Sequence, residues 1–133
     1  MMTIATNDLY IASSRYKVRS IAIWRYSAQG ITRMQLDIDE VIKALAHPVR
    51  RDILHWLKDP QAYFADQEHS LENGVCAGKI DQRTGLSQST VSAHLATLQR
   101  AGLISSKKVG QWHFFKRNEE TIQAFLNHIS QAL

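Results

Sequence analysis

The sequence predicts a mainly helical domain that carries one small β-hairpin. Two observations support this prediction. Two amphipathic helical segments meet at Gly85 and Leu86, where a glycine supplies the positive φ that a tight turn between helices requires. Directly after them, two short segments with strand-like alternation flank Gly110 and Gln111. A helix-turn-helix followed at once by a hairpin predicts the winged helix-turn-helix fold.

Two further helices are expected ahead of this module. An apolar stripe with Asp37 or Asp39 as its N-terminal cap marks the first, and Pro48 opens the second at a position where proline is tolerated. The two apolar stripes consist of Ile38, Val41, Ile42 and Leu45, and of Val49, Ile53, Trp56 and Leu57. The second helix ends before Pro60, and the polar residues 60–74 predict a loop with at most one helical turn.

The second helix of the helix-turn-helix points to a function. The first helix is expected at residues 75–84 with Ile80 buried, and Ser87 is expected to cap the second. The second helix has a buried stripe of Val91, Leu95 and Leu98, and an outward face of Gln88, Ser89, Thr90, Ser92 and Ala93. No charged side chain occurs in residues 88–99, whereas a merely solvated face usually carries several. Small polar groups and an amide suit the edges of DNA bases, so we predict a DNA-reading helix. The alternative is a helix-turn-helix used only for packing.

The hairpin carries cations at both ends. Its strands are expected at residues 103–109 and 112–117, after Gly102 ends the preceding helix. Cations there, and on the first helix of the motif, are expected to contact the phosphates beside a bound groove. These candidates are Lys79, Arg83, Lys107, Lys108, Lys116 and Arg117. The alternative is that the lysines only keep the surface solvated.

Basic charge is concentrated on the module assigned to DNA. The formal net charge is +4, but residues 1–33 alone carry +4, so residues 34–133 sum to zero. Within that neutral part, residues 79–117 hold seven cations and one acid, whereas residues 34–78 hold four cations and eight acids. A positive potential over the helix-turn-helix and hairpin favours a polyanionic partner.

Residues 1–33 are expected to form a disordered extension to a DNA-binding and dimerisation domain of residues 34–133. They show no persistent helical or strand period, and Met34 directly precedes a well-formed helical pattern. One interpretation is that the native chain starts at Met34 and the leader is upstream sequence translated in error. The alternatives are a flexible basic arm with non-specific phosphate affinity, or a transit peptide. No apolar run approaches the roughly 18 residues of a membrane span, so we expect a soluble, cytoplasmic protein without a membrane partner.

Apolar stripes on the first and last helices predict a homodimer. Apolar residues from Ile122 to Leu133 mark a last amphipathic helix. A domain of about 100 residues can hardly cover both stripes with its own core. The side chains expected in the interface are Ile38, Val41, Ile42, Ile122, Phe125, Leu126 and Ile129.

Three stretches together resemble one known family. IKALAHPVRRDIL at residues 42–54, GLSQSTVSAHLATLQRAGLI at residues 85–104 and GQWHFFKR at residues 110–117 are similar to the ArsR/SmtB family of bacterial winged-helix repressors. The resemblance covers nearly all of residues 34–133. It implies a homodimer joined through its first and last helices, which leaves operator DNA when an inducer binds. By position it makes Gln88, Ser89, Ser92 and Ala93 the base-facing residues and Gln111 the wing tip, with His94 on the helix face or the DNA side.

The family's metal sites transfer poorly to this sequence. One such site needs two or three cysteines near the start of the first helix of the motif, where this chain has only Cys76. The possible co-ligands are His69, Asp66, Glu68 or a residue of a second subunit. The other site uses the last helix, which offers His128 with Glu119 and Glu120. A metal ion bound through Cys76 and His69 therefore stays open, and thiol oxidation at Cys76 is the favoured use of its reactivity. The alternative is a buried spacer.

Enzyme function is not expected. Cys76 with a distant histidine would lack an orienting third group, and the sequence shows neither a glycine-rich phosphate cradle nor paired carboxylates. A winged-helix module that binds protein without binding DNA is the remaining alternative. Such a module would present an apolar or acidic recognition face, whereas this face is polar, uncharged and flanked by cations. The sequence therefore predicts a sequence-specific DNA-binding regulator of transcription, a repressor released by an inducer or by thiol oxidation.

Overall fold

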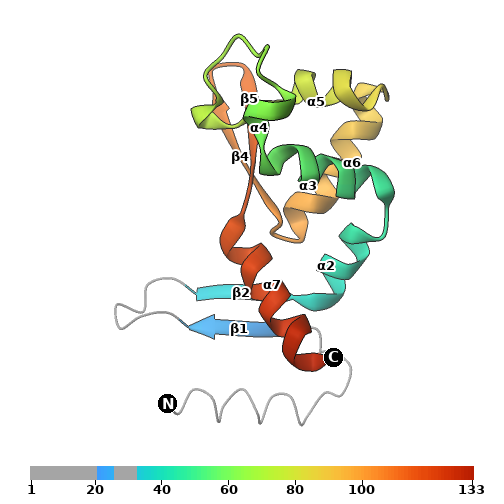
Figure 1. Cartoon of the computed structure of the whole chain (residues 1–133), viewed down its shortest axis with the longest axis vertical. Helices are drawn as coiled ribbons and strands as arrows, with labels where there is room; N and C mark the ends of the chain where they lie inside the picture. The colour runs from blue at the N-terminus through green and yellow to red at the C-terminus, as the bar shows by residue number, and fades with distance from the viewer. Residues whose placement is uncertain (1–20, 26–32) are drawn as a thin grey trace.

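The computed structural model describes residues 21–25 and 33–133 (Figure 1). The elements follow the order β1 (Ile21–Arg25), β2 (Arg33–Asp37), α2 (Ile38–Leu45), α3 (Pro48–Lys58), α4 (Pro60–Tyr63), η2 (Leu71–Asn73), β3 (Val75–Cys76), α5 (Ala77–Thr84), α6 (Gln88–Arg100), β4 (Ile104–Val109), β5 (Trp112–Arg117) and α7 (Glu119–Ala132). Figure 1 places α5 and the tip of the β4–β5 hairpin at one end of the long axis, and α7 with the β1–β2 hairpin at the other. The predicted winged helix-turn-helix is confirmed.

Local sequence signals set the helix starts. The Asp37 carboxylate accepts the Glu40 N–H at 3.2 Å and caps α2, and the Ser87 hydroxyl accepts the Thr90 N–H at 3.2 Å and caps α6. Gly85 ends α5 with φ +72°, the left-handed conformation that the turn needs. His47 caps α3 through Nδ1, which accepts the Val49 N–H at 3.1 Å, although histidine is not among the residues preferred there.

The core lies between the helices and the inner side of the wing. Its buried side chains come from both strands and helices and include Leu36, Val41, Ile53, Phe64, Val75, Ile80, Val91, Leu98, Leu103, Phe115 and Ala124. The three strands of the wing sheet run in the order β3–β5–β4, all antiparallel. Gly110, with φ +64°, forms the turn between β4 and β5.

Two predicted boundaries are wrong. Val75 and Cys76 do not begin the first helix of the motif; they form β3, which pairs with Phe115 and Phe114 of β5. Met34 lies inside β2 rather than just before a helix. In both places the backbone N–H and C=O groups are hydrogen-bonded to another strand. The strand therefore forms only because a partner strand is present, and a local sequence pattern does not contain that partner.

The N-terminal extension is also more ordered than predicted. Residues 21–25 and Arg33 belong to an antiparallel pair in which Ile21 faces Asp37 and Arg25 faces Arg33. The prediction of disorder is wrong for these residues, whose Ile and Trp side chains favour a strand once a partner strand is present. The rest of the predicted extension, residues 1–20 and 26–32, lies outside the described residues. No helix in the described part of the chain is long and apolar enough to cross a membrane.

Candidate nucleic-acid interface

Helix α6 presents the face that the sequence predicts. Val91 and Leu98 are fully buried and Leu95 is 4% exposed, so one side of the helix is fixed to the core. The opposite side lies in solvent and consists of four polar residues and one alanine, namely Gln88, Ser89, Thr90, Ser92 and Ala93. Leu86, which follows the turn glycine, is 38% exposed.

Hydrogen bonds divide the polar residues of this face into two groups. The Ser87 hydroxyl lies 2.9 Å from Thr90 Oγ1 and 3.3 Å from Ser89 Oγ, so three hydroxyls at the helix start are already linked. In the described part of the chain, the side chains of Gln88 and Ser92 make no hydrogen bond. Gln88 and Ser92 are therefore the residues whose polar groups are free to meet base edges.

A groove separates this helix face from the wing. It is an open pocket of about 300 Å³ between α6, α5 and β5, and its lining includes Gln88, Ser92 and His113. At its far end the Gln99 amide donates to the Ser106 hydroxyl at 3.0 Å and joins α6 to β4. Burial raises the pKa of Asp81, the acidic residue of the lining. The groove thus lies between α6 and the wing, and Figure 1 places α5 and the tip of the hairpin at the same end of the molecule.

The hairpin register places the two adjacent lysines on different faces. Residues of a strand alternate between faces, and Lys108 pairs with His113 whereas Lys107 pairs with Phe114. His113 lines the groove beside α6, so Lys108 shares the face of the recognition helix. Lys107 faces the other way, and its ammonium donates to Asn73 Oδ1 at 3.0 Å. Of the two predicted phosphate contacts, Lys108 is the one that points toward the reading surface.

We therefore expect different results from two neighbouring substitutions. Lys108→Ala should weaken binding to all DNA sequences alike and reduce the slope of log affinity against log salt by about 0.9, the value for one phosphate contact. Lys107→Ala, the matched control, should leave that slope close to the wild-type value. Fluorescence anisotropy titrations with a cognate and a random duplex at several salt concentrations measure both. Equal slope changes for the two variants would contradict this assignment.

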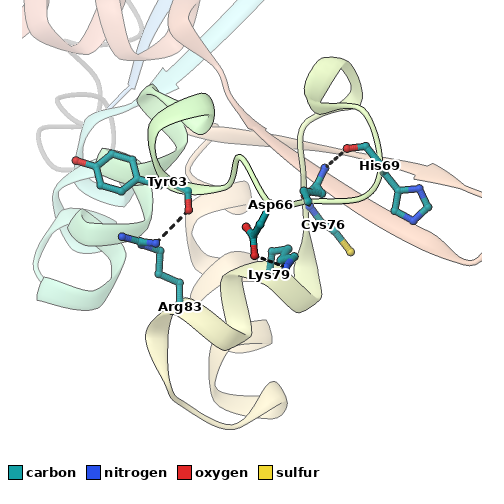
Figure 2. Close-up of polar contacts among 7 residues, drawn as sticks. Tyr63, Asp66, His69, Cys76, Lys79 and Arg83 are labelled. Atoms are coloured by element: carbon teal, nitrogen blue, oxygen red, sulfur yellow. Dashed lines mark hydrogen bonds and ion pairs between the residues drawn. The ribbon is translucent and has the colours of Figure 1, made fainter.

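Lys79 and Arg83 have partners within the chain. Lys79 donates to Asp66 at 2.8 Å, and this contact lowers the pKa of the Asp66 carboxyl (Figure 2). Arg83 donates to the Tyr63 carbonyl at 3.0 Å, and its guanidinium lies 4.9 Å from the centre of the Tyr63 ring and 5.3 Å from that of Trp56. These contacts tie α5 to the loop after α4, to the end of α4 and to α3. The expectation that both cations are free for phosphates does not fit this arrangement.

The positions of His94 and Arg117 also do not fit the predicted contacts with DNA. His94 is half-buried, and its Nδ1 lies 3.0 Å from an Arg50 guanidinium nitrogen, toward α3 and away from the groove. Arg117 donates twice to the Glu119 carboxylate, at 2.7 and 2.9 Å, and this contact lowers the pKa of Glu119. Neither residue is oriented toward a duplex lying on α6 and the wing tip.

Cys76 lies where the wing and the helix-turn-helix meet. Its side chain is 9% exposed, and its N–H donates to Gln67 Oε1 at 2.8 Å. The Gln67 amide in turn donates to the carbonyls of His69 and Gly74, at 3.1 and 3.2 Å, and holds the loop against β3. Because β3 pairs with β5 and continues into α5, a change at Cys76 would reach both the wing and α5.

The loop does fold toward Cys76. Asp66, Glu68, His69 and Cys76 line one open pocket of about 280 Å³. The His69 ring, however, packs against the rings of Trp112 and Phe114, with centroids 5.0 and 5.5 Å apart. In the described part of the chain, no three His, Cys, Asp or Glu side chains are grouped so that they could hold a metal ion. A metal site at Cys76 and His69 stays a prediction.

Several residues that build this surface were missed from the sequence. Gln67 acts through three side-chain hydrogen bonds within its loop and to β3, and Asn73 and Gln99 act through one each to the wing. The sequence has no local signal for these contacts. The position of His113 could have been predicted from the sequence. Successive side chains of a strand point to opposite faces, so His113 lies on the face of the hairpin opposite to Trp112.

Comparison with known proteins agrees with this geometry. The family model described as bacterial regulatory protein, arsR family, matches residues 71–106. The chain is 44% identical over 85 residues to the uncharacterized HTH-type transcriptional regulator YbzH of Bacillus subtilis, covering 62% of this chain and 85% of that protein. It is 31% identical to the transcriptional activator HlyU of Vibrio cholerae, covering 65% and 68%, and 29% identical to the transcriptional repressor SdpR of Bacillus subtilis, covering 68% and 86%.

A solved structure supports the fold. The homodimeric winged helix-turn-helix DNA-binding domain of Mb0332 from Mycobacterium bovis, a possible ArsR-family regulator, matches with a TM-score of 0.51 at 24% identity, covering 71% of this chain and 77% of that one. The chain belongs to the ArsR family of bacterial regulatory proteins, and it is a winged helix-turn-helix, DNA-binding transcriptional regulator rather than an enzyme.

Proposed function

We propose that this chain is a homodimeric repressor that binds a pseudo-palindromic operator and leaves it when Cys76 is oxidised or an inducer binds. The observation that supports operator reading most directly is the exposed, uncharged face of α6, on which Gln88 and Ser92 have no partner in the described part of the chain. The groove between this face and the wing is open to solvent. Two such helices in a dimer would enter successive major grooves about 34 Å apart.

The exposed apolar residues at the opposite end support the homodimer. Leu126 of α7 is 51% exposed and Ile42 of α2 is 49% exposed. Figure 1 places α7 and α2 in the half of the molecule opposite α5 and the tip of the wing. Ile122 and Phe125 are partly buried against the core, and Ile129 is half-buried. A second copy that covers these five side chains would remove them from water.

Two residues of the predicted interface do not belong to it. Ile38 is 6% exposed and Val41 is fully buried, and both are part of the core of the subunit. The apolar stripe of α2 is therefore shared: Ile38, Val41 and Ala44 face inward and Ile42 faces outward. A helix stripe wider than one contact face cannot be assigned to core or interface from the sequence, because both use the same residue types.

Repression follows from occupancy of the operator. A dimer that covers two successive major grooves excludes other proteins from the same DNA, and this needs only the reading surface and the dimer surface described above. Relatives of this chain include the repressor SdpR and the activator HlyU, so the direction of regulation is part of the proposal.

The position of Cys76 supports release by oxidation. Its thiolate would attack a peroxide, forming a sulfenic acid and releasing hydroxide. Because Cys76 is only 9% exposed, the neighbouring residues would have to move to make space for the added oxygen atom. The strand that contains Cys76 pairs with Phe114 and Phe115 on one side and leads into α5 on the other. Distortion there would shift the wing relative to α6.

A gel-shift titration on the DNA upstream of the protein's own gene tests the proposal. The reduced protein should bind one site with a dimer stoichiometry and discriminate it from random DNA. Binding to random DNA with the same affinity, or a failure to bind any fragment of that region, would contradict operator recognition.

The release mechanism is tested by one substitution. Cys76→Ser should bind the operator like the wild type but should no longer be released by hydrogen peroxide, because serine cannot form a sulfenic acid. A reductant should restore binding of the oxidised wild type. If the Cys76→Ser variant is released by peroxide as fully as the wild type, thiol sensing is wrong. The same titration with zinc, on the wild type and on His69→Ala, tests the metal prediction.

A further inference from the structure

Three helices are joined at the side chain of Arg50. Its Nε donates to the Ala44 carbonyl at 2.7 Å, and one terminal nitrogen donates to the Lys43 carbonyl at 3.1 Å. Both carbonyls lie in the last turn of α2, where a helix leaves its acceptors without intrahelical donors and favours a cation. The other terminal nitrogen lies 3.0 Å from His94 Nδ1, in the middle of α6. Arg50 of α3 thus connects the end of α2 to the recognition helix.

The chemistry of this contact fixes the protonation state of His94. A guanidinium carries only donors and does not lose its proton in proteins, so Nδ1 of His94 has to accept. A nitrogen that accepts carries no proton. The contact therefore exists only for the neutral imidazole with its proton on Nε2. Protonation of His94 removes the acceptor and places two cations 3.0 Å apart.

Among the residues that the structure describes, no acidic side chain acts on His94 to stabilise its protonated form. The His47 ring lies with its centroid 4.5 Å from that of His94, and its own Nδ1 accepts the Val49 N–H. Helix α6 has no charged residue before Arg100. On α2, the Lys43 side chain points to Glu40 in solvent. Asp81 of α5 lines the groove with Gln88 and Ser92, and β4 meets α6 through Ser106 and Gln99. Burial, His47 and Arg50 together lower the pKa of His94.

We propose that Arg50 and His94 are positioning residues for DNA reading, and that protonation of His94 releases the recognition helix from α2 and weakens operator binding. The proposal rests on the proposed function, in which α6 reads bases and the end of the molecule that carries Ile42 forms the dimer. In a dimer, the distance and angle between the two copies of α6 depend on how firmly each is held to its own α2. His94 lies two residues after Ser92, so its contact with Arg50 acts on the part of α6 that faces DNA.

The direction of the pH effect follows from the lowered pKa. The neutral form of His94 is favoured in the folded protein, so its contribution to stability is complete above the ordinary histidine value of 6.5. As the pH falls below that value, the unfolded or unlocked state takes up protons first. The contribution is lost progressively down to the lowered pKa of the folded state.

The test compares operator affinity across pH in the wild type and two variants. In anisotropy titrations from about pH 8 to about pH 5.5, the ratio of cognate to random affinity of the wild type should fall by about 10- to 100-fold, as expected for the loss of a charge-assisted hydrogen bond. At pH 8, His94→Asn should have the same ratio of cognate to random affinity as the wild type. Between about pH 8 and about pH 5.5 this ratio should decrease much less in the variant than in the wild type. The asparagine Oδ1 stands where Nδ1 stood and accepts from Arg50, but it does not titrate in this range. His94→Ala should show a low ratio at every pH.

A second histidine serves as the matched control. His55→Asn replaces an exposed histidine of α3 that lies outside the reading surface and contacts Tyr63, and it should leave the acid decrease of the ratio intact. The proposal is wrong if the affinity ratio of the wild type does not change with pH, or if the affinity ratio of His94→Asn decreases in acid as much as that of the wild type. Circular dichroism melts at each pH confirm that the compared variants are folded.

A measurement without DNA separates this proposal from the proposed function. Imidazole ¹⁵N shifts in the NMR spectrum of the free protein at neutral pH should show His94 neutral, with the proton on Nε2 and none on Nδ1. A protonated Nδ1 in that spectrum would rule out the hydrogen bond from Arg50 to His94, and with it this proposal, even if operator binding is normal. If the spectrum shows the expected tautomer but the protein prefers no DNA sequence at neutral pH, operator recognition by this chain is wrong. The proposed role of the Arg50–His94 contact in DNA reading is then wrong as well.

Discussion

Replacing Gln88 or Ser92 with alanine should weaken binding to the cognate site by about 1–3 kcal/mol each while leaving binding to random DNA unchanged. Both side chains are exposed on the groove between α6 and the wing, and neither makes a hydrogen bond in the described part of the chain. The loss appears only where they meet a matching base edge. Anisotropy titrations with cognate and random duplexes at one salt concentration measure the difference.

Ser89→Ala is the matched control for this prediction. Its hydroxyl already lies 3.3 Å from that of Ser87 at the helix start, so its removal should change specificity less than that of Ser92. Equal losses on cognate and random DNA for the Gln88 and Ser92 variants would mean that the two residues act without reading sequence. A larger effect of Ser89 than of Ser92 would show that the division of this face by hydrogen bonding is wrong.

Replacing Leu126 with glutamate should convert the protein to a monomer and abolish tight operator binding. Burial of one leucine contributes about 1.5–3 kcal/mol, and a symmetric dimer contains two copies, so the dimer dissociation constant should rise by roughly 10²- to 10⁴-fold. Leu126 is 51% exposed in the subunit, which makes it a cleaner site than Phe125, whose ring packs partly on the core. Sedimentation velocity at micromolar protein measures the change.

Gln131→Glu adds the same charge to the same helix on a different side and should leave the dimer intact. Ile42→Glu, on α2, should act like Leu126→Glu if both residues lie in one interface. A wild-type protein that sediments as a monomer at micromolar concentration would end the dimer proposal, because no stable pair would then exist to disrupt.

Patterns along the chain were enough to predict the reading module. Ser87 as a cap, Gly85 at the turn and the spacing of Val91, Leu95 and Leu98 are local features, and each is realised in α6 as predicted. The wing was equally accessible, because the alternation on both sides of Gly110 belongs to a hairpin whose strands are neighbours in sequence. These elements are specified by residues within a few positions of one another.

The roles of the charged and apolar residues were not accessible in this way. Lys79, Arg83 and Lys107 are cations in the right region, but Asp66, Tyr63 and Asn73 bind them from the segment of residues 63–73, which no motif describes. Ile38 and Val41 have the same chemistry as Ile42, and only the direction of α2 decides which of them faces a partner. A side chain's type limits what it can bind, and its neighbours in space determine what it does bind.

The sequence by itself determined the fold class, the exposed polar face of α6 and the family, because caps, turns and periodicity are short-range features of the chain. Only the tertiary structure decided which cations remain free, which apolar residues remain exposed and why the segment from His47 to Arg50 matters. The guanidinium of Arg50 reaches the last carbonyls of α2 and a histidine 44 positions away in α6. Contacts of that range form only when packed helices bring their donors and acceptors within about 3 Å of one another.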